Sequence, residues 1–217
     1  IIPQIFDVIT NLRTGVEKKI KRPKNCPVCK SQLITDEHGA GIRIICPNKK
    51  CPAKEINRVI YFASRKCANI EGLGESTVTA LHDAGYVTKI SDIYKLKKEQ
   101  ILSLDGFKEK SANNLLEGIN KARKLSLPVF IMSLSIPSVG EETSLDLAKY
   151  FKTKENFLHA THNDLVKIYG IGEKIIAEVL HFLENPDNKQ EINKILQEVE
   201  VSDYIDSNLH KSLSDYR

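Results

Sequence analysis

The stretch Ile168-Tyr169-Gly170-Ile171-Gly172 places an isoleucine between two glycines, directly before a helical pattern of apolar residues. Three other stretches repeat this arrangement, and successive copies begin 34, 32 and 32 residues apart. They are Ile70-Glu71-Gly72-Leu73-Gly74, Leu104-Asp105-Gly106-Phe107-Lys108 and Ile136-Pro137-Ser138-Val139-Gly140. Apolar residues at three-and-four spacing follow each copy and predict an amphipathic helix. We number these glycine turns 1 to 4 in chain order, and they predict a mainly helical fold made of four repeated units.

The glycines in these turns indicate a particular use. Glycine has no Cβ, so it adopts positive φ easily and lets a ligand come close to the backbone. The helix that follows presents unpaired amides and the positive end of its dipole, which suit a phosphate group. Such a site contacts no base edge, so binding to nucleic acid would not depend on sequence. The candidate DNA-binding residues are Gly72, Gly74, Gly106, Lys108, Lys110, Gly140, Gly170, Gly172 and Lys174.

The four turns are not equal. Turn 2 has Lys108 at the second glycine position, and turn 3 has Ser138 at the first. Lys108 either brings a charged side chain to a phosphate or belongs to a turn that serves packing alone. Turns 1 and 4 keep both glycines and are the better candidates for DNA contact. A helical solenoid that binds peptides is an alternative interpretation of the period, but its repeats carry glycine singly.

Four of the five cysteines form two pairs at metal-ligand spacing, Cys26-Pro27-Val28-Cys29 and Cys46-Pro47-Asn48-Lys49-Lys50-Cys51. This spacing, with a predicted β-hairpin of residues 32–35 and 42–45 between the pairs, is typical of a zinc ribbon. Two disulfides are the alternative, which a reducing compartment disfavours. Four sulfur ligands leave zinc no open position, so the metal would be structural. His38 could replace a cysteine, but its place at the hairpin tip favours a solvated histidine. Cys67 is expected to be a free, half-buried thiol.

Composition narrows the class of protein. The chain has 217 residues, 41% of them hydrophobic, and a net charge of +4, which excludes a disordered chain. Residues 11–66 hold fourteen Lys or Arg against four acids, either as a solvated surface or as an electrostatic footprint for phosphates. No apolar run is long enough for a membrane span, and the chain starts at Ile1 without an initiating Met and without the charged, apolar and small-residue zones of a signal peptide. We therefore expect a piece of a longer cytoplasmic protein.

A four-cysteine ribbon followed by four tandem turns resembles the C-terminal half of the bacterial NAD-dependent DNA ligases, whose turns are helix-hairpin-helix motifs. The resemblance covers about residues 1–200 and includes Cys46-Pro47-Asn48, Phe62-Ala63-Ser64-Arg65, Glu109-Lys110-Ser111-Ala112 and Val139-Gly140-Glu141. Ile2-Pro3-Gln4-Ile5 is similar to the last strand of that family's oligonucleotide-binding barrel.

The resemblance implies four regions: the barrel end and a linker (1–22), a four-cysteine zinc finger with the following helix (23–66), a helical domain of tandem motifs (67–200) and a polar tail (201–217). A small C-terminal domain of the BRCT type is common in the family but is lacking in this sequence, which is too short to hold one; either the sequence stops before it or the protein has only a brief tail.

The resemblance also implies an activity for the parent protein, which is the sealing of nicks in duplex DNA during replication and repair. In that family a lysine of a Lys-x-Asp-Gly motif takes AMP from NAD, with magnesium or manganese assisting. The nearest match here is Ser103-Leu104-Asp105-Gly106, where serine stands in place of that lysine, so this part alone is expected to be inactive. Expected partners are nicked DNA and the upstream adenylation and barrel domains, in a monomer without membrane contact. A non-enzymatic DNA-repair or recombination adaptor is the alternative.

Overall fold

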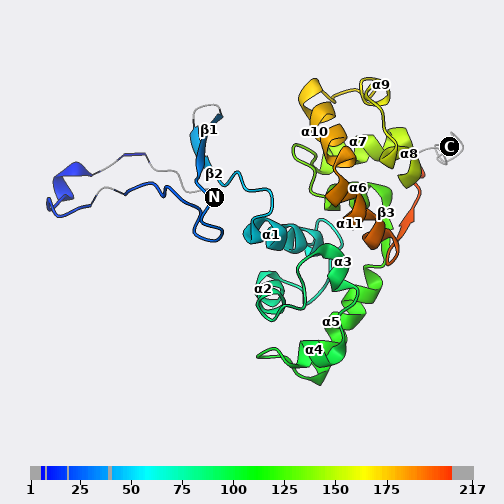
Figure 1. Ribbon diagram of the computed structural model, residues 1–217, viewed down its shortest axis with the longest axis horizontal. Helices are drawn as coiled ribbons and strands as arrows, with labels where there is room; N and C mark the ends of the chain where they lie inside the picture. The colour runs from blue at the N-terminus through cyan, green and yellow to red at the C-terminus, as the bar shows by residue number, and fades with distance from the viewer. Residues whose placement is uncertain (1–5, 8, 19, 39–40, 207–217) are drawn as a thin grey trace, which may run out of the picture. The chain divides into compact units, whose positions relative to one another are not determined.

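The computed structural model describes residues 6–206, except for residues 8, 19, 39 and 40. The chain divides into two compact units, 1–51 and 52–217, drawn in Figure 1. The first contains the 3-10 helix η1 (Thr10–Leu12) and the strands β1 (Ile34–His38) and β2 (Gly41–Ile45). The second contains α1 (Pro52–Ala63), α2 (Glu75–Asp83), α3 (Ile90–Ile93), α4 (Lys98–Leu102), α5 (Glu109–Lys121), β3 (Lys124–Ser126), α6 (Leu127–Ser133), α7 (Glu141–Phe151), α8 (Lys154–Leu158), α9 (His162–Leu165), α10 (Glu173–Glu184), α11 (Pro186–Leu196) and β4 (Glu200–Ser202).

The first unit is built around an antiparallel hairpin. Strands β1 and β2 pair from Ile34 opposite Ile45 to His38 opposite Gly41. The predicted hairpin between the two cysteine pairs is thus present, although its first strand begins two residues later than expected. The large apolar side chains described between residues 6 and 20 are exposed. The strand expected at residues 2–5 lies outside the described part of the chain.

The second unit is a helical body in which each long helix buries one apolar face. α1 belongs to this unit, because Val59, Phe62 and Ala63 pack into its core. α4 and α5 lie at one end, whereas α9 and α10 lie at the other (Figure 1). Over the described residues, no helix is long and apolar enough to cross a membrane.

A small parallel sheet pairs the segments that follow α5 and α11. β3 follows α5, β4 follows α11, and the two pair from Lys124 opposite Glu200 to Ser126 opposite Ser202. Arg123, just before β3, donates from Nη1 to Glu198 Oε2 at 2.7 Å and from Nη2 to the Tyr94 carbonyl at 2.9 Å. Its guanidinium also lies over the Tyr94 ring, 5.1 Å from the centroid. One side chain therefore links three segments that are far apart in sequence.

The polar tail expected from residue 201 begins with ordered structure. Val201 in β4 is buried, and the Tyr204 amide donates to the Lys152 carbonyl at 2.8 Å. The aromatic ring of Tyr204 lies under Lys152 Nζ, 4.9 Å from it. Residues up to 204 are thus docked on the helical unit, and residues 207–217 of the expected tail lie outside the described part.

Candidate nucleic-acid interface and metal centre

The four glycine turns have one backbone geometry. In each, the third residue has positive φ: 84° at Gly72, 83° at Gly106, 64° at Ser138 and 83° at Gly170. In each, the amide of the fourth residue donates to the carbonyl of the first, at 3.2, 3.2, 3.1 and 3.2 Å in chain order. A positive φ at the third residue with this bond is the pattern of a type II turn. Ser138 therefore takes the glycine conformation without being glycine.

Apolar side chains fix each turn to the helical core. The first residue of every turn is buried, and so is the fourth in turns 1, 3 and 4, while Phe107 of turn 2 packs partly buried against the core. The second residue is exposed in all four: Glu71, Asp105, Pro137 and Tyr169. The tip of each turn is consequently held firmly and faces solvent.

Each turn ends at the start of a helix. The fifth residue, which is Gly74, Lys108, Gly140 or Gly172, is the N-cap of α2, α5, α7 or α10 and is extended. No side chain caps the amides of the first helical turn at the three glycine N-caps. A Cβ on any of these three glycines would meet nothing within 4 Å. The helix starts behind turns 1, 3 and 4 are therefore open to a ligand that accepts hydrogen bonds.

Turn 2 keeps the same backbone but is more closed. Lys108 occupies the N-cap, and its amide donates to Ser111 Oγ at 2.9 Å. Lys110 is the second residue of α5, and Lys174 has the same position in α10. Both lysines are exposed. All nine residues predicted for DNA binding thus lie in the turns or in the first two helical residues behind them.

A carboxylate leads each of the four helices, and three of these carboxylates are paired with a base. Lys98 Nζ lies 2.5 Å from Glu109 Oε2, and His162 Nε2 lies 3.3 Å from Glu173 Oε2. Glu141 Oε2 lies 4.0 Å from Lys66 Nζ. An acid at a helix start interacts favourably with the helix dipole but repels phosphate, and the two lysine partners offset that repulsion at Glu109 and Glu141. Sequence reasoning did not single out these bases, although Lys98 and His162 both stand eleven residues before their glutamates.

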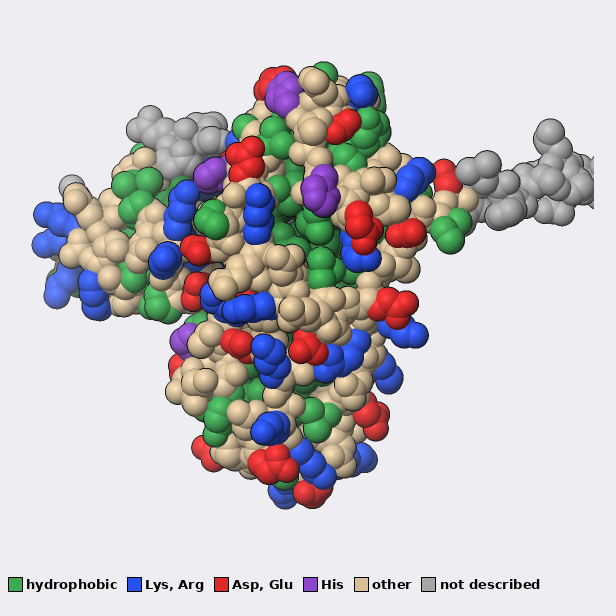
Figure 2. Space-filling model, turned by 45° about the vertical axis from the view of Figure 1, so that its right-hand side comes forward, with side chains coloured by type: hydrophobic (Ala, Val, Ile, Leu, Met, Phe, Trp, Pro, Cys, Tyr) green, Lys and Arg blue, Asp and Glu red, His purple; other side chains and the backbone are tan. Residues whose placement is uncertain are grey.

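Basic and acidic side chains are mixed on the face drawn in Figure 2, over the end that carries α4 and α5, without a large area of one sign there. On this face, phosphate binding would therefore depend on backbone amides and a few lysines rather than on a broad basic surface.

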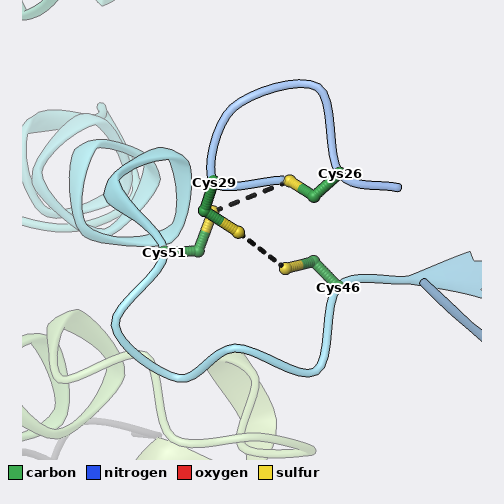
Figure 3. A group of neighbouring side chains, drawn as sticks. All are labelled: Cys26, Cys29, Cys46 and Cys51. Carbon is green, nitrogen blue, oxygen red and sulfur yellow. Dashed lines mark hydrogen bonds between the residues drawn. The ribbon is translucent and has the colours of Figure 1, made fainter. Parts of the chain in front are cut away.

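The four predicted metal ligands lie together in the first unit. The Sγ atoms of Cys26, Cys29, Cys46 and Cys51 are all within 4.8 Å of one another. Cys26 and Cys51 approach to 3.9 Å, and Cys29 and Cys46 to 3.5 Å (Figure 3). All four are free thiols, which removes the disulfide alternative. Zinc with four sulfurs at about 2.3 Å places those sulfurs about 3.8 Å apart, so the cluster fits a tetrahedral zinc site.

A tight turn brings Cys26 and Cys29 together. In this turn, the Lys30 amide donates to the Cys26 carbonyl at 3.0 Å, and Lys30 has a φ of 62°. A hydrogen bond with the Ser31 hydroxyl, 3.3 Å from Cys29 Sγ, together with the Ser31 amide, lowers the pKa of the Cys29 thiol to about 5. Burial and the neighbouring Cys29 sulfur raise the pKa of Cys46 to about 11. Because the pKa of Cys46 is raised, the four thiols do not all lose their protons without a metal. A bound dication would stabilise four thiolates.

Cys67 lies outside this cluster. It is buried in the helical unit, more completely than the half-buried position expected, and burial raises the pKa of its thiol. A buried, protonated thiol is unreactive.

Comparison with known proteins gives the family. A family model described as "SAM-like Helix-hairpin-helix tandem" matches residues 65–121, which contain turns 1 and 2, and one described as "Helix-hairpin-helix motif" matches residues 129–192, which contain turns 3 and 4. A DNA ligase of Nitratiruptor sp. is 40% identical over 91% of this chain, and one of Halalkalibacterium halodurans is 37% identical over 92%. The chain belongs to the DNA ligase family, as a C-terminal portion.

This portion of a DNA ligase spans about three tenths of those relatives, 29% of each. A DNA ligase of Methylacidiphilum infernorum, 37% identical over 90% of the chain, is matched over a similar share of 28%. The predicted family and the predicted fold, a zinc ribbon followed by tandem helix-hairpin-helix motifs, are confirmed.

Proposed function

We propose that this DNA ligase portion holds nicked duplex DNA through the backbone amides of its four glycine turns while other parts of the ligase join the strands. The observation that carries the proposal is the repeated geometry of the turns, in which a positive-φ residue leads into a helix start, with an open glycine N-cap in three of the four. Amides there donate to phosphate oxygens without reading a base.

The contribution to catalysis is positional. Phosphate contacts on both sides of a nick keep the 3′ hydroxyl and the 5′ phosphate in register, which lowers the entropic part of the barrier to joining. The reaction itself, which we propose to use NAD and magnesium or manganese, belongs to the rest of the ligase. The stretch closest to its Lys-x-Asp-Gly motif lies in turn 2, where Ser103 Oγ donates to the Gln100 carbonyl at 2.7 Å. A serine in this position offers no amine to carry AMP.

The four-cysteine cluster would hold a zinc ion for structural purposes. All four positions of a tetrahedral ion would be filled by sulfur, so the ion would bind neither water nor substrate. Its role would be to stabilise the small first unit, which has a two-stranded sheet and few buried side chains among its described residues. We further propose a cytoplasmic monomer that acts in DNA replication and repair.

Binding and joining can be tested separately. The chain should bind nicked duplex DNA in fluorescence anisotropy, with an affinity that falls as salt rises and that is similar for unrelated sequences. The full-length ligase without residues 52–206, the described part of the helical unit, should seal nicks far more slowly than the intact enzyme, with self-adenylation unchanged. DNA binding without any effect on joining would favour a repair adaptor, and no DNA binding would favour a peptide-binding repeat.

A further inference from the structure

Tyr169, the second residue of turn 4, is the most exposed large hydrophobic side chain described in the helical unit. Its side chain is 99% exposed, while the flanking Ile168 and Ile171 are buried at 7% and 8% exposure. The backbone is therefore fixed on both sides of a ring that packs on nothing in the described chain. Val166, three residues earlier, is also 53% exposed. A tyrosine held rigidly in water at the tip of a turn has gained nothing from folding and is available to a partner.

The turns differ in chemistry at this exposed position. Turns 1 and 2 carry the acids Glu71 and Asp105, whereas turns 3 and 4 carry Pro137 and Tyr169. The net charge also differs between the segment that contains turns 1 and 2 and the segment that contains turns 3 and 4. Residues 65–121 contain nine Lys or Arg and eight acids, for a net charge of +1, and residues 129–192 contain six and ten, for a net charge of −4. The second half therefore has no net positive charge with which to attract DNA and presents non-ionic groups at its tips.

The ring lies beside the open helix start of turn 4. Tyr169 is followed by Gly170 at φ 83° and by Gly172, the N-cap of α10, and a Cβ at either glycine would meet nothing within 4 Å. A phosphate bound at this helix start would bring the sugars and bases of the same strand next to the ring. Apolar side chains that contact duplex DNA do so from the minor groove, against sugars or between base steps. Aromatic contacts of this kind tolerate any sequence.

We propose that Tyr169 is a DNA-contacting residue whose ring packs in the minor groove of the bound duplex, so that turn 4 holds DNA by apolar contact in addition to its amides. The proposal rests on the proposed function, since it needs DNA at turn 4. It assigns two modes of binding to one chain. Turn 2 acts with Lys108 and Lys110 and depends on salt, and turn 4 adds to its amides and to Lys174 a ring whose contribution salt hardly changes.

A fluorescence experiment tests the contact directly. The chain contains no tryptophan, so in Tyr169→Trp the substituted residue would be the single indole. Titration with nicked duplex should change its emission and protect it from acrylamide, in step with binding measured by anisotropy of labelled DNA. Tyr150→Trp is the matched control, because Tyr150 is near the end of α7 farthest from turn 3 and is 37% exposed. Its emission should not respond. DNA binding that leaves the indole at position 169 unprotected overturns the proposal.

Affinity measurements test the energetic role. Tyr169→Ala should weaken binding of nicked duplex roughly tenfold to a hundredfold, because one stacking contact is lost. Its slope of log affinity against log salt should equal that of the unaltered chain, and Tyr169→Phe should bind normally. Lys108→Ala is the comparison in turn 2, where loss of a phosphate contact flattens the slope by about 0.9.

Normal binding by Tyr169→Ala overturns this inference while leaving the proposed function intact, and so does an equal loss in Tyr169→Phe. Failure of the unaltered chain to bind DNA refutes the proposed function and this inference with it. Circular dichroism of each variant checks that the helices are retained.

Discussion

Gly118 in the middle of α5 packs directly against the backbone of Glu71 in turn 1. A Cβ at residue 118 would lie 2.9 Å from the Glu71 carbonyl oxygen and 3.2 Å from its amide nitrogen. Turn 1 therefore rests on the helix that follows turn 2, and its position depends on the absence of one methyl group.

Gly118→Ala should destabilise the chain for this reason. Alanine favours an isolated helix by roughly 1 kcal/mol over glycine, so propensity alone predicts the opposite sign. Because the clash is with backbone, we expect a net loss of about 1–3 kcal/mol in the free energy of unfolding in urea. Glu117→Ala, at the exposed neighbouring position of α5, should change it by less than about 0.5 kcal/mol. A Gly118→Ala chain as stable as the original would show that turn 1 can move away freely.

Gly74→Val and Gly172→Val separate ligand approach from folding. Both glycines are extended N-caps, and a Cβ added to either would have no other heavy atom within 4 Å, so the first added carbon meets no protein atom there. Stability should fall by only about 0.5–1 kcal/mol, because valine is a poorer N-cap than glycine, whereas affinity for nicked duplex should fall about tenfold because the added carbons occupy the space of the phosphate. Ala177→Val, an exposed change one turn further along α10, should bind DNA normally. Full affinity in both glycine variants would place the phosphate contact elsewhere.

The sequence predicted the turns and the ribbon well, because both depend on local chemistry. Glycine before a helix and cysteine at two-residue spacing each restrict the chain within a few residues. The junction at β3 and β4 could not be predicted, since Arg123, Tyr94 and Glu198 meet only after folding. The spacing of apolar residues also failed to predict which side chains of α7 are buried. Leu145 fits the apolar spacing but is 37% exposed, whereas Ser144 is buried at 1%.

Arg123→Ala should loosen that junction. The guanidinium holds Glu198 and the Tyr94 carbonyl at once, and its loss leaves both without their donor. We expect a loss of about 1–3 kcal/mol in unfolding free energy. Arg123→Lys should recover only a small part of it, because an ammonium lacks the planar fork that reaches both acceptors. Lys149→Ala, which removes an exposed pair with Asp146 at 3.5 Å, should cost less than about 1 kcal/mol. Equal losses in the alanine variants at positions 123 and 149 would argue that the junction contributes no more than a surface ion pair.

Cys29→Ser tests whether the sulfur cluster holds zinc and what the metal supports. A serine hydroxyl is a poor zinc ligand, so the variant should lose the roughly one zinc per chain that we expect in the unaltered protein. Far-UV circular dichroism should keep its helical signal, because α1 to α11 all lie in the second unit, whereas protease should cut faster within residues 24–51. Cys67→Ser is the matched control, since Cys67 is buried away from the cluster and should leave the zinc content unchanged. Stoichiometric zinc in Cys29→Ser would contradict a site made of these four sulfurs, and loss of the helical signal would show that the second unit depends on the metal as well.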